Sequence, residues 1–452
     1  MNQLDAATQA FSNFAWGLPL LILLIGGGIF FLLYSNLIPY RYLGHAIGIL
    51  RGKYDDPDDP GDIDHYEALS TALASTIGMG NISGVAVAIA TGGPGALFWM
   101  WMTAIVGMAT KFFTCTLAIM FRGKDSRGDV QGGPMYFIME GLGEKWKPMA
   151  TFFSVAALVG ALPIFNANQF TQTLTDVLLV PAGFSDSFGT KFVVGILITI
   201  LVSLVIFGGI KRIGGVAGKL VPVMVVLYSA MVIYILLVNA SEIPAAFALI
   251  FDDAFSGNAI LGGALGEIIR SGVKRGAFSN EAGIGTAPMA HGAAKTAQPI
   301  REGLIAMMGP AIDTLIVCTM TALAIIITGV WQDGGSQGIS LTLKAFESAM
   351  PGVGSYLLMI CVSIFALSSL FTFSYYGTKS LGFLIGAEKQ HYYNYFYVAS
   401  ICFGAAVSIT SVINIIDGAY ALMAFPTMIA AILLAPRVKA AAKEYFDSMQ
   451  KA

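Results

Sequence analysis

Two short glycine-rich segments interrupt otherwise apolar stretches of this sequence, where they would expose backbone N–H and C=O groups. They are residues 75–81 (STIGMGN) and 276–285 (GAFSNEAGIG). An unwound backbone leaves N–H and C=O groups that no helix satisfies, and at membrane depth it is tolerated only where protein or a water-filled cavity surrounds it. Paired interrupted helices of this kind are typical of the central binding site of a secondary transporter. The two segments therefore predict a transporter site built largely from backbone groups.

The composition of the chain supports a membrane location. Of its 452 residues, 56% are hydrophobic and 12% are charged, whereas soluble globular chains carry roughly 25% charged residues. The formal net charge of −2 argues against a polyanionic partner such as nucleic acid. The cysteines lie in apolar segments without metal-ligand spacing, so we interpret them as small buried hydrophobes.

Apolar stretches of about 20 residues are long enough to cross a bilayer, and the sequence contains about eleven. We therefore expect an all-α polytopic membrane protein embedded in the lipid bilayer. The first stretch is predicted to be a retained helix rather than a cleaved signal, because the residues before it include Asp5 and no Lys or Arg. The predicted spans are 14–38, 66–91, 95–120, 148–179, 191–209, 216–238, 258–293, 301–330, 352–377, 392–412 and 416–435.

The distribution of Lys and Arg among the loops predicts the orientation of these spans. With the N-terminus outside, the inner loops and the C-terminal tail hold nearly all of the loop cations, and the outer loops hold only Lys191 and Lys344. We therefore expect a multi-pass plasma-membrane protein whose N-terminus is outside and whose C-terminus is cytoplasmic.

The order of the spans predicts an internal symmetry. The interrupted segments fall in the second and seventh spans, so each begins a group of five, and a five-span unit repeated in sequence forms an inverted repeat. The segment 331–350 is expected to be an outer loop with an amphipathic helix, in a position suited to a lid. The expected divisions are an extra N-terminal helix in 1–40, a first repeat in 66–238, a second repeat in 258–435 and a cytoplasmic tail in 436–452.

Several motifs resemble those of a known transporter family. They are residues 78–84 (GMGNISG), 92–96 (GGPGA), 131–136 (QGGPMY) and 278–285 (FSNEAGIG). Because they recur in order over nearly the whole chain, the sequence resembles the alanine or glycine:cation symporters.

This resemblance implies sodium-coupled uptake of the small amino acids alanine and glycine, with sodium as the coupling ion. No further cofactor and no obligatory protein partner are expected. The resemblance also implies the inverted-repeat fold of the bacterial leucine transporters, whose broken helices correspond to the spans 66–91 and 258–293. A proton-coupled amino acid permease is the alternative.

The implied substrate is a zwitterion, and the two breaks offer groups for both of its charges. Backbone N–H groups freed at 78–80, with a half-helix dipole behind them, suit the carboxylate. Freed carbonyls at 278–280 suit the ammonium group. The expected substrate-binding residues are Thr76, Gly78, Met79, Gly80, Asn81, Phe165, Asn168, Gln169, Phe278, Ser279, Asn280 and Gly283.

Met79, Phe165 and Phe278 are expected to limit the size of the substrate, with Asn168 and Gln169 as polar contacts. Each assignment has a structural alternative. Aromatic and Met side chains at helical spacing often fill a core, glycines in membrane helices allow close packing, and buried amides form hydrogen bonds between helices.

The resemblance also implies a cation site. Sodium needs several oxygen ligands, which carbonyls at a helix break and hydroxyl groups supply without a His or Cys cluster. By resemblance, Ser368 and Ser369 face the first break, so the implied site combines their hydroxyls with the carbonyls of Ala74 and Ile77. Paired serines can instead bond to carbonyls of their own helix.

Ionisable residues inside spans are costly unless they are paired or wet. The run from Glu267 to Arg275 is expected to line an outer vestibule, or else to form a solvated loop. Glu281 lies within the second break, where holding the unwound backbone is the favoured role and binding a cation or a proton are alternatives. Lys111 and Asp313 are in neighbouring spans, but their spacing does not establish a contact.

A channel and a membrane enzyme are the other classes to consider. A channel needs a continuous pore, often from rings of subunits, whereas this chain has paired breaks and an internal repeat. Glu281 with His291 would suggest acid–base or metal chemistry, but the ten-residue spacing does not fit a metalloprotease helix, and the sequence has no phosphate-binding loop. We therefore assign no catalytic residues and expect a transporter rather than an enzyme.

Overall fold

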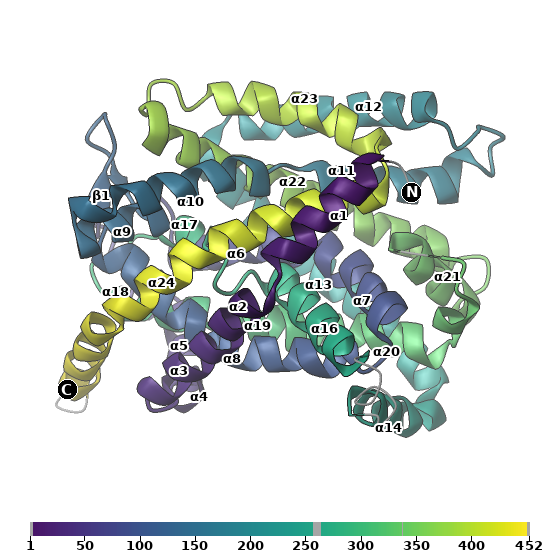
Figure 1. Ribbon diagram of the computed structural model, residues 1–452, viewed down its shortest axis with the longest axis horizontal. Helices are drawn as coiled ribbons and strands as arrows, with labels where there is room; N and C mark the ends of the chain where they lie inside the picture. The colour runs from purple at the N-terminus through teal and green to yellow at the C-terminus, as the bar shows by residue number, and fades with distance from the viewer. Residues whose placement is uncertain (1–2, 256–263, 337, 450–452) are drawn as a thin grey trace.

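The computed structural model describes residues 3–255, 264–336 and 338–449, which are almost entirely helical (Figure 1). Strands β1 (Gly123–Lys124) and β2 (Val130–Gln131) pair antiparallel in a small hairpin. The N- and C-termini lie toward opposite ends of the long axis (Figure 1). The expected all-α architecture is confirmed. The expected start of the second repeat at 258 and the end of the tail at 450–452 fall outside the described residues.

The N-terminal helix is bent. Helix α1 (Gln3–Ala15) is followed by α2 (Leu18–Leu21), the π-helical turn η1 (Ile22–Gly26) and α3 (Gly27–Tyr34), and the direction changes by 47° between Ala15 and Leu18. Pro19 lies at this bend and cannot donate a backbone hydrogen bond to the preceding turn. Two short helices follow, α4 (Ile38–Arg41) and α5 (Leu43–Leu50).

The next group of helices begins with the first break. Helix α6 (His65–Thr76) stops, and the chain resumes as η2 (Gly80–Gly84) and α7 (Val85–Gly92) with a bend of 45°. The remaining helices of this group are α8 (Ala96–Met120), α9 (Pro134–Leu142), η3 (Glu144–Trp146), α10 (Lys147–Gly160), α11 (Ile164–Leu174), η4 (Thr175–Leu179), α12 (Phe188–Ile206) and α13 (Gly209–Val238).

The following group contains the second break, between α16 (Ala264–Asn280) and α17 (Thr286–His291). It is preceded by η5 (Ala240–Glu242) and α14 (Ile243–Ala254), a helix that we did not expect from the sequence. The remaining helices are α18 (Pro299–Ala306), α19 (Met308–Pro310), η6 (Ala311–Cys318), α20 (Thr319–Ile327), η7 (Val330–Asp333), α21 (Ile339–Ala349), α22 (Gly354–Ile385), α23 (Tyr392–Ala406) and α24 (Ile409–Met449).

Seven helices are long and apolar enough to cross a membrane in the described part of the chain, or nine if each of two bent pairs forms one span. Eleven were expected. The two expected spans without such a helix are 258–293, which is interrupted after the charged helix α16, and 392–412, where α23 has 15 residues. Residues 409–412 belong instead to α24, which continues to Met449.

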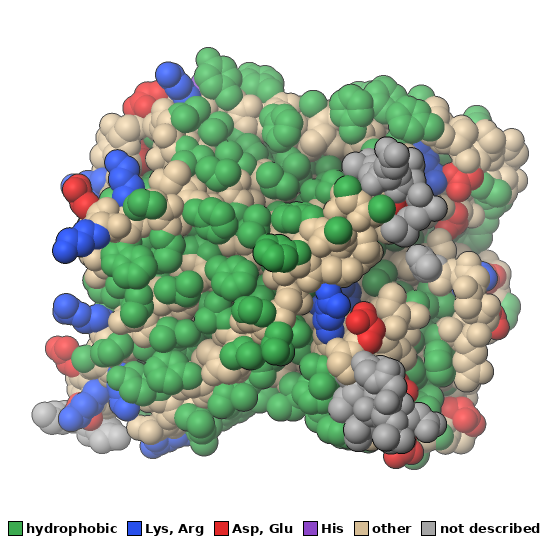
Figure 2. Space-filling model, in the orientation of Figure 1, with side chains coloured by type: hydrophobic (Ala, Val, Ile, Leu, Met, Phe, Trp, Pro, Cys, Tyr) green, Lys and Arg blue, Asp and Glu red, His purple; other side chains and the backbone are tan. Residues whose placement is uncertain are grey.

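Burial separates a central scaffold from the periphery. Within the most apolar window of each helix, 89% of α8 is buried but only 28% of α12 and 33% of α13. Helix α8 packs against α16, α17, α18 and α3, so it supports both sides of the second break. Figure 2 shows apolar side chains over the middle of one face, with most charged side chains toward its two edges, as expected for a surface that meets lipid.

Candidate functional site

The first break is fixed by contacts that require glycine. Ile77 leaves the helical conformation with ψ 89°, and the Gly78 N–H donates to Asn81 Oδ1 at 2.9 Å. A β-carbon at Gly78 would overlap Ser369 Oγ of α22. Thr76 ends α6 and donates to the carbonyl of Ala72 at 3.1 Å. The close approach of α22 therefore explains the glycine, and Asn81 takes up one of the N–H groups expected to be free.

The second break is built from left-handed residues. Glu281, Gly283 and Gly285 have φ of 54°, 85° and 109°. A non-glycine residue in this region is uncommon and is held there by its surroundings. At Gly283 a β-carbon would lie 2.8 Å from side-chain atoms of both Leu24 and Met428. The backbone at this break is thus enclosed by α24 and η1, and both interruptions expected from the sequence are present.

Asp313 of η6 joins the two breaks. Its carboxylate accepts from Asn81 Nδ2 at 2.7 Å, from Ser279 Oγ at 2.7 Å and from Thr314 Oγ1 at 2.7 Å. Asn280 Nδ2 donates to Thr314 Oγ1 at 3.3 Å. These side chains are all fully buried. Buried polar groups must be hydrogen-bonded to avoid a desolvation cost, so Asp313 fixes Asn81 and Ser279 relative to each other.

Glu281 is held by hydroxyl groups from three helices. Its carboxylate accepts from Tyr420 Oη and Ser75 Oγ, each at 3.3 Å, and from Thr286 Oγ1. Tyr376 Oη in turn donates to Ser75 Oγ at 3.0 Å. Tyr376 and Tyr420 were not expected at the site, because only the packing of α22 and α24 brings them to the second break.

The aromatic candidates meet at the breaks. The rings of Phe165 and Phe278 lie 5.1 Å apart at 84°, and the ring of Tyr420 lies 5.4 Å from Phe278. A β-carbon at Gly80 would lie 3.4 Å from Phe278 Cδ1. Met79 is fully buried in the same core. These side chains pack around the first break, and Phe278 contacts the backbone at Gly80, where the chain resumes as η2.

The two amides of α11 face different neighbours. Gln169 Oε1 accepts from Ser83 Oγ at 2.5 Å and from the Ile339 N–H at 3.1 Å, so it lies between η2 and α21. Asn168 Nδ2 donates to the carbonyls of Gly404 and Val407, at 3.0 and 2.8 Å. Asn168 is thus directed toward the end of α23, whereas Gln169 lies next to the first break.

The two serines expected to bind the cation have different neighbours. Ser369 Oγ lies 2.9 Å from the Ala74 carbonyl oxygen, so the hydroxyl of α22 reaches the last turn of α6 beside Ile77. Ser368 Oγ lies 2.9 Å from the Phe365 carbonyl of its own helix and 3.7 Å from Met224 Sδ of α13. The structure brings Ser369, and not Ser368, into contact with Ala74.

The expected site is closed in this structure. Every expected substrate and cation residue is buried. A cavity beside the second break, lined in part by Thr110, Ala277 and Asn280, measures only about 10 Å³, roughly the space of one water molecule. Access to the breaks therefore requires the contacts at one end of the site to separate.

The contacts at one end of the site are ionic. Asp417 of α24 pairs with Lys274 at 2.8 Å and with Arg275, both from α16, and its backbone carbonyl accepts from Trp16 Nε1 at 2.8 Å. Arg275 also lies over the ring of Phe278 at 5.1 Å. Asp417, Lys274 and Arg275 border a cleft of about 190 Å³, which is also lined by Glu267 and Arg270. The charged run before the second break thus lines a cleft, as the sequence suggests.

The opposite contacts link the far ends of the broken helices. Glu302 of α18 accepts from His291 Nδ1 at the end of α17, at 2.5 Å, and from His65 Nδ1 at the start of α6. All three side chains are buried. Arg122 donates to the carbonyls of Gly292, Ala294, Pro60 and Thr296, which holds the loops at the same end.

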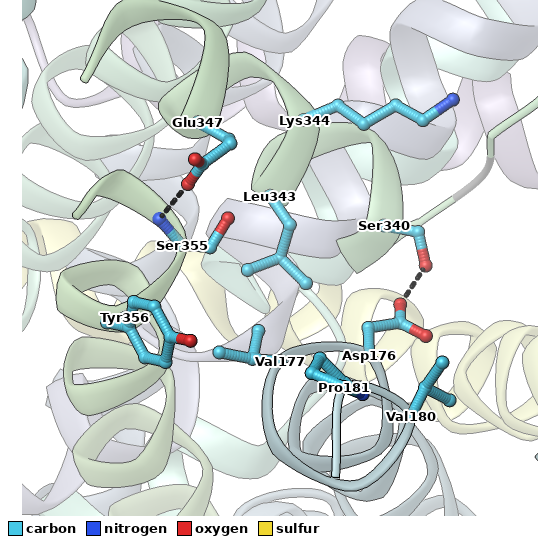
Figure 3. Close-up of a pocket in the computed structure, with 10 residues that line it drawn as sticks. All are labelled: Asp176, Val177, Val180, Pro181, Ser340, Leu343, Lys344, Glu347, Ser355 and Tyr356. Carbon is cyan, nitrogen blue, oxygen red and sulfur yellow. Dashed lines mark hydrogen bonds between the residues drawn. The ribbon is translucent and has the colours of Figure 1, made fainter. Parts of the chain in front are cut away.

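A larger groove of about 480 Å³ lies away from the breaks, between η4, α21 and α22 (Figure 3). Ser340 Oγ donates to Asp176 Oδ2 at 2.7 Å, and the Ser355 N–H donates to Glu347 Oε2 at 3.1 Å. Hydrogen bonds from the Gly352 and Ser355 N–H groups lower the pKa of Glu347, so this carboxylate stays ionised and fixes the loop after α21. The helix expected within 331–350 is present as α21, and the hydrogen bond from Ser340 to Asp176 joins it to η4.

Comparisons with known proteins identify relatives along the whole chain. The profile of the sodium:alanine symporter family matches residues 1–452. The sodium/alanine symporter AgcS of Methanococcus maripaludis is 40% identical, over 96% of this chain and 95% of the relative. A probable sodium/glutamine symporter of Bacillus subtilis, GlnT, is 35% identical over 96% of this chain and 89% of the relative.

A solved structure has the same fold. The crystal structure of MhsT in complex with L-phenylalanine matches with a TM-score of 0.61 and 15% identity, covering 83% of this chain and 89% of that chain. At this identity the similarity concerns the fold alone.

Proposed function

Because the chain belongs to the sodium:alanine symporter family, we propose that it couples sodium entry to the uptake of alanine and glycine by alternating access. The family and its relatives are membrane transporters of amino acids, not enzymes. Our proposal goes beyond this family assignment in three respects: sodium is the coupling ion, glycine is a substrate beside alanine, and transport proceeds by alternating access.

The observation that carries the proposal is the junction of the two breaks at Asp313, with Asn81 on one side and Ser279 on the other. In this proposal the substrate carboxylate binds the N–H groups of Met79 and Gly80, since the Gly78 N–H is bonded to Asn81. The ammonium group binds carbonyls at 278–280. Backbone N–H and C=O dipoles then stabilise both charges of the substrate, without a buried side chain of opposite charge.

The proposed size limit comes from the aromatic cluster. Phe165 and Phe278 pack edge to face, and Phe278 lies beside Gly80, so in this proposal the two rings limit the size of the substrate side chain. Thr76, Asn81, Asn280 and Gly283 are assigned to holding the unwound backbone. Gln169 is assigned a positioning role between η2 and α21, and Asn168 a role in packing α11 against α23.

The proposed sodium site uses the hydroxyl of Ser369 with the carbonyls of Ala74 and Ile77, which lie at the contact between α22 and α6. Ser368 is a more distant contributor because its hydroxyl points toward Met224. Sodium bound there would tie α6 to α22 and favour the conformation that binds substrate, which couples the two ligands thermodynamically.

Alternating access requires two sets of contacts that open in turn. We propose that the Asp417 pairs with Lys274 and Arg275 separate on the extracellular side, and that the His65–Glu302–His291 cluster separates on the cytoplasmic side. In this orientation the N-terminus is outside and the C-terminus is in the cytoplasm of a plasma-membrane protein. A ligand drives the exchange only through different affinities for the two states.

Equilibrium binding of labelled alanine to the purified protein tests this proposal. We expect alanine affinity to rise with sodium concentration at constant ionic strength, with potassium as the control cation. Glycine should compete and phenylalanine should not. Binding that is equal in sodium and potassium, or competition by phenylalanine equal to that by glycine, would contradict the coupling or the proposed pocket.

A further inference from the structure

A basic groove lies outside the transport site, between the end of α3, α4 and the C-terminal part of α24. It measures about 530 Å³ and is bordered by Arg41 from α4 and by Lys439 and Lys443 from α24. In Figure 1 these elements lie together near the C-terminus, and Figure 2 shows Lys and Arg side chains along the same edge of the molecule. This edge is the one that we assign to the cytoplasm.

In the part of the chain that the structure describes, no acidic side chain pairs with the three cations of the groove. Across residues 3–255, 264–336 and 338–449, neither Arg41, Lys439 nor Lys443 forms an ion pair within 4.0 Å. Lys439 Nζ lies 4.1 Å from the centre of the Tyr34 ring, which holds its position without neutralising its charge. Asp447 borders the groove, so the wall carries a net positive charge.

The walls of the groove are held in place by aromatic contacts. The rings of Tyr42 and Phe446 stack with centres 3.7 Å apart, and His45 Nε2 lies 2.8 Å from Tyr445 Oη. These contacts fix the C-terminal part of α24 against α4 and α5. A ligand between the cations therefore meets walls that are already ordered, which lowers the entropic cost of binding.

The groove continues into an apolar surface. Helix α3 lies against α24 along its length, with Gly27 facing Met428 and Ile432 and Tyr34 facing Lys439. Exposed apolar side chains of these two helices include Leu33 at 65% and Leu433 at 49% exposure. A ligand that suits both regions has an anionic head and a long hydrocarbon tail.

We propose that this groove binds an anionic phospholipid of the cytoplasmic leaflet. Its phosphate diester would lie among Arg41, Lys439 and Lys443, and an acyl chain would lie over Leu33 and Leu433. Basic pockets between helices at the cytoplasmic surface are suited to such headgroups, since they sit within the negative surface potential of that leaflet. Free phosphate shares the headgroup chemistry but makes no use of the apolar surface.

Native mass spectrometry of the full chain in a neutral detergent tests the proposal, by titration with phosphatidylglycerol, phosphatidylcholine or inorganic phosphate. We expect one saturable phosphatidylglycerol molecule. The triple variant R41Q/K439Q/K443Q should weaken its binding on the order of tenfold or more. The control triple variant K145Q/K147Q/K211Q removes equal charge from exposed positions on the same side and should retain it.

Three results would overturn the proposal. Equal loss in both triple variants would mean that diffuse surface charge attracts the lipid, and equal binding of phosphatidylcholine would mean that the headgroup charge is irrelevant. Phosphate that occupies the groove and blocks the lipid at equal concentration would identify a free-anion site. If the first triple variant is not monodisperse, K443Q alone serves as the test, because this exposed side chain can be shortened without unpacking a helix, and it should give a smaller loss of the same kind.

Discussion

Ser369 makes the most direct contact between the two helices assigned to sodium, with its Oγ 2.9 Å from the carbonyl oxygen of Ala74. Ser369→Ala removes one proposed ligand and leaves the aromatic pocket intact. We expect the sodium concentration for half-maximal alanine binding to rise about tenfold, which corresponds to about 1.4 kcal/mol. Alanine affinity at saturating sodium should change little.

Ser368→Ala is the matched comparison, because that hydroxyl faces Met224 and its own helix, so we expect a smaller shift in its sodium response than in that of Ser369→Ala. Titration of both variants with sodium, at fixed total salt, separates the two positions. An unchanged sodium response in Ser369→Ala, or an equal shift in both variants, would remove Ser369 from the site.

Gly78 allows α22 to approach the first break, since a β-carbon there would overlap Ser369 Oγ. Gly78→Val should therefore displace the unwound segment and abolish alanine binding, while the protein still inserts into the membrane. Gly48→Val is the control, because a β-carbon at Gly48 meets no atom within 4 Å. Normal alanine affinity in Gly78→Val, measured by equilibrium binding, would reject the pocket at this break.

At the scale of elements, η6 contacts both interrupted helices through the carboxylate of Asp313. Asp313→Asn replaces one carboxylate oxygen by an NH₂ group, which must face a donor from Asn81, Ser279 or Thr314. A buried donor without an acceptor costs about 1–3 kcal/mol. We expect a lower melting temperature and weaker alanine binding, whereas Asp333→Asn at the exposed end of η7 should have neither effect. If both variants melt and bind like the wild type, the two breaks are held together by other contacts.

The cluster around Glu302 closes the opposite end of the broken helices. Cys115 is buried there against Ala287 and Ala306, so its reaction with a maleimide reports opening at this end. Glu302→Gln replaces one acceptor of the two imidazole N–H groups by a donor, and we expect Cys115 to react several-fold faster, in a background in which Cys402 is replaced by Ser.

Glu144→Gln, an exposed change at the same end, is the control for this measurement and should leave the rate unchanged. A rate in Glu302→Gln equal to that of the control would show that the histidine and glutamate contacts do not limit opening.

The breaks could be predicted from sequence because they depend on local residues. Glycines at 78 and 80 and at 283 and 285 interrupt apolar stretches, and the structure places the interruptions there. The partners of the break residues could not be predicted. Asp313, Tyr376 and Tyr420 reach the breaks only through helix packing, and Asp313 bonds to Asn81 and Ser279 while forming no ion pair with Lys111.

An intramembrane acid is costly unless it is paired or wet, which is the signal that singles out Asp313 in the sequence. The sequence does not predict which side chains form hydrogen bonds with Asp313. The same limit applies to the pair at 368 and 369, where sequence offers two adjacent hydroxyls and only the rotation of α22 decides which one meets Ala74.

At the scale of the whole molecule, the scaffold and the lipid-facing surface are distinct. Helix α8 is buried among the broken helices, while α12 and α13 expose apolar faces. Contacts at both ends of the site are closed at once, with Asp417 at one end and Glu302 at the other. In the alternating-access cycle that we propose, this closed form lies between the outward-open and inward-open states. The proposal then requires that sodium and substrate together stabilise it more than either ligand alone.

Uptake of labelled alanine into proteoliposomes tests the central claim most directly, with a sodium gradient and a proton gradient imposed separately. We predict accumulation above the external concentration when sodium alone is directed inward, with glycine as a competing substrate. Accumulation driven by the proton gradient alone would contradict sodium coupling and direct attention to Glu281 and Asp313. The absence of accumulation under either gradient would contradict symport of alanine by this protein.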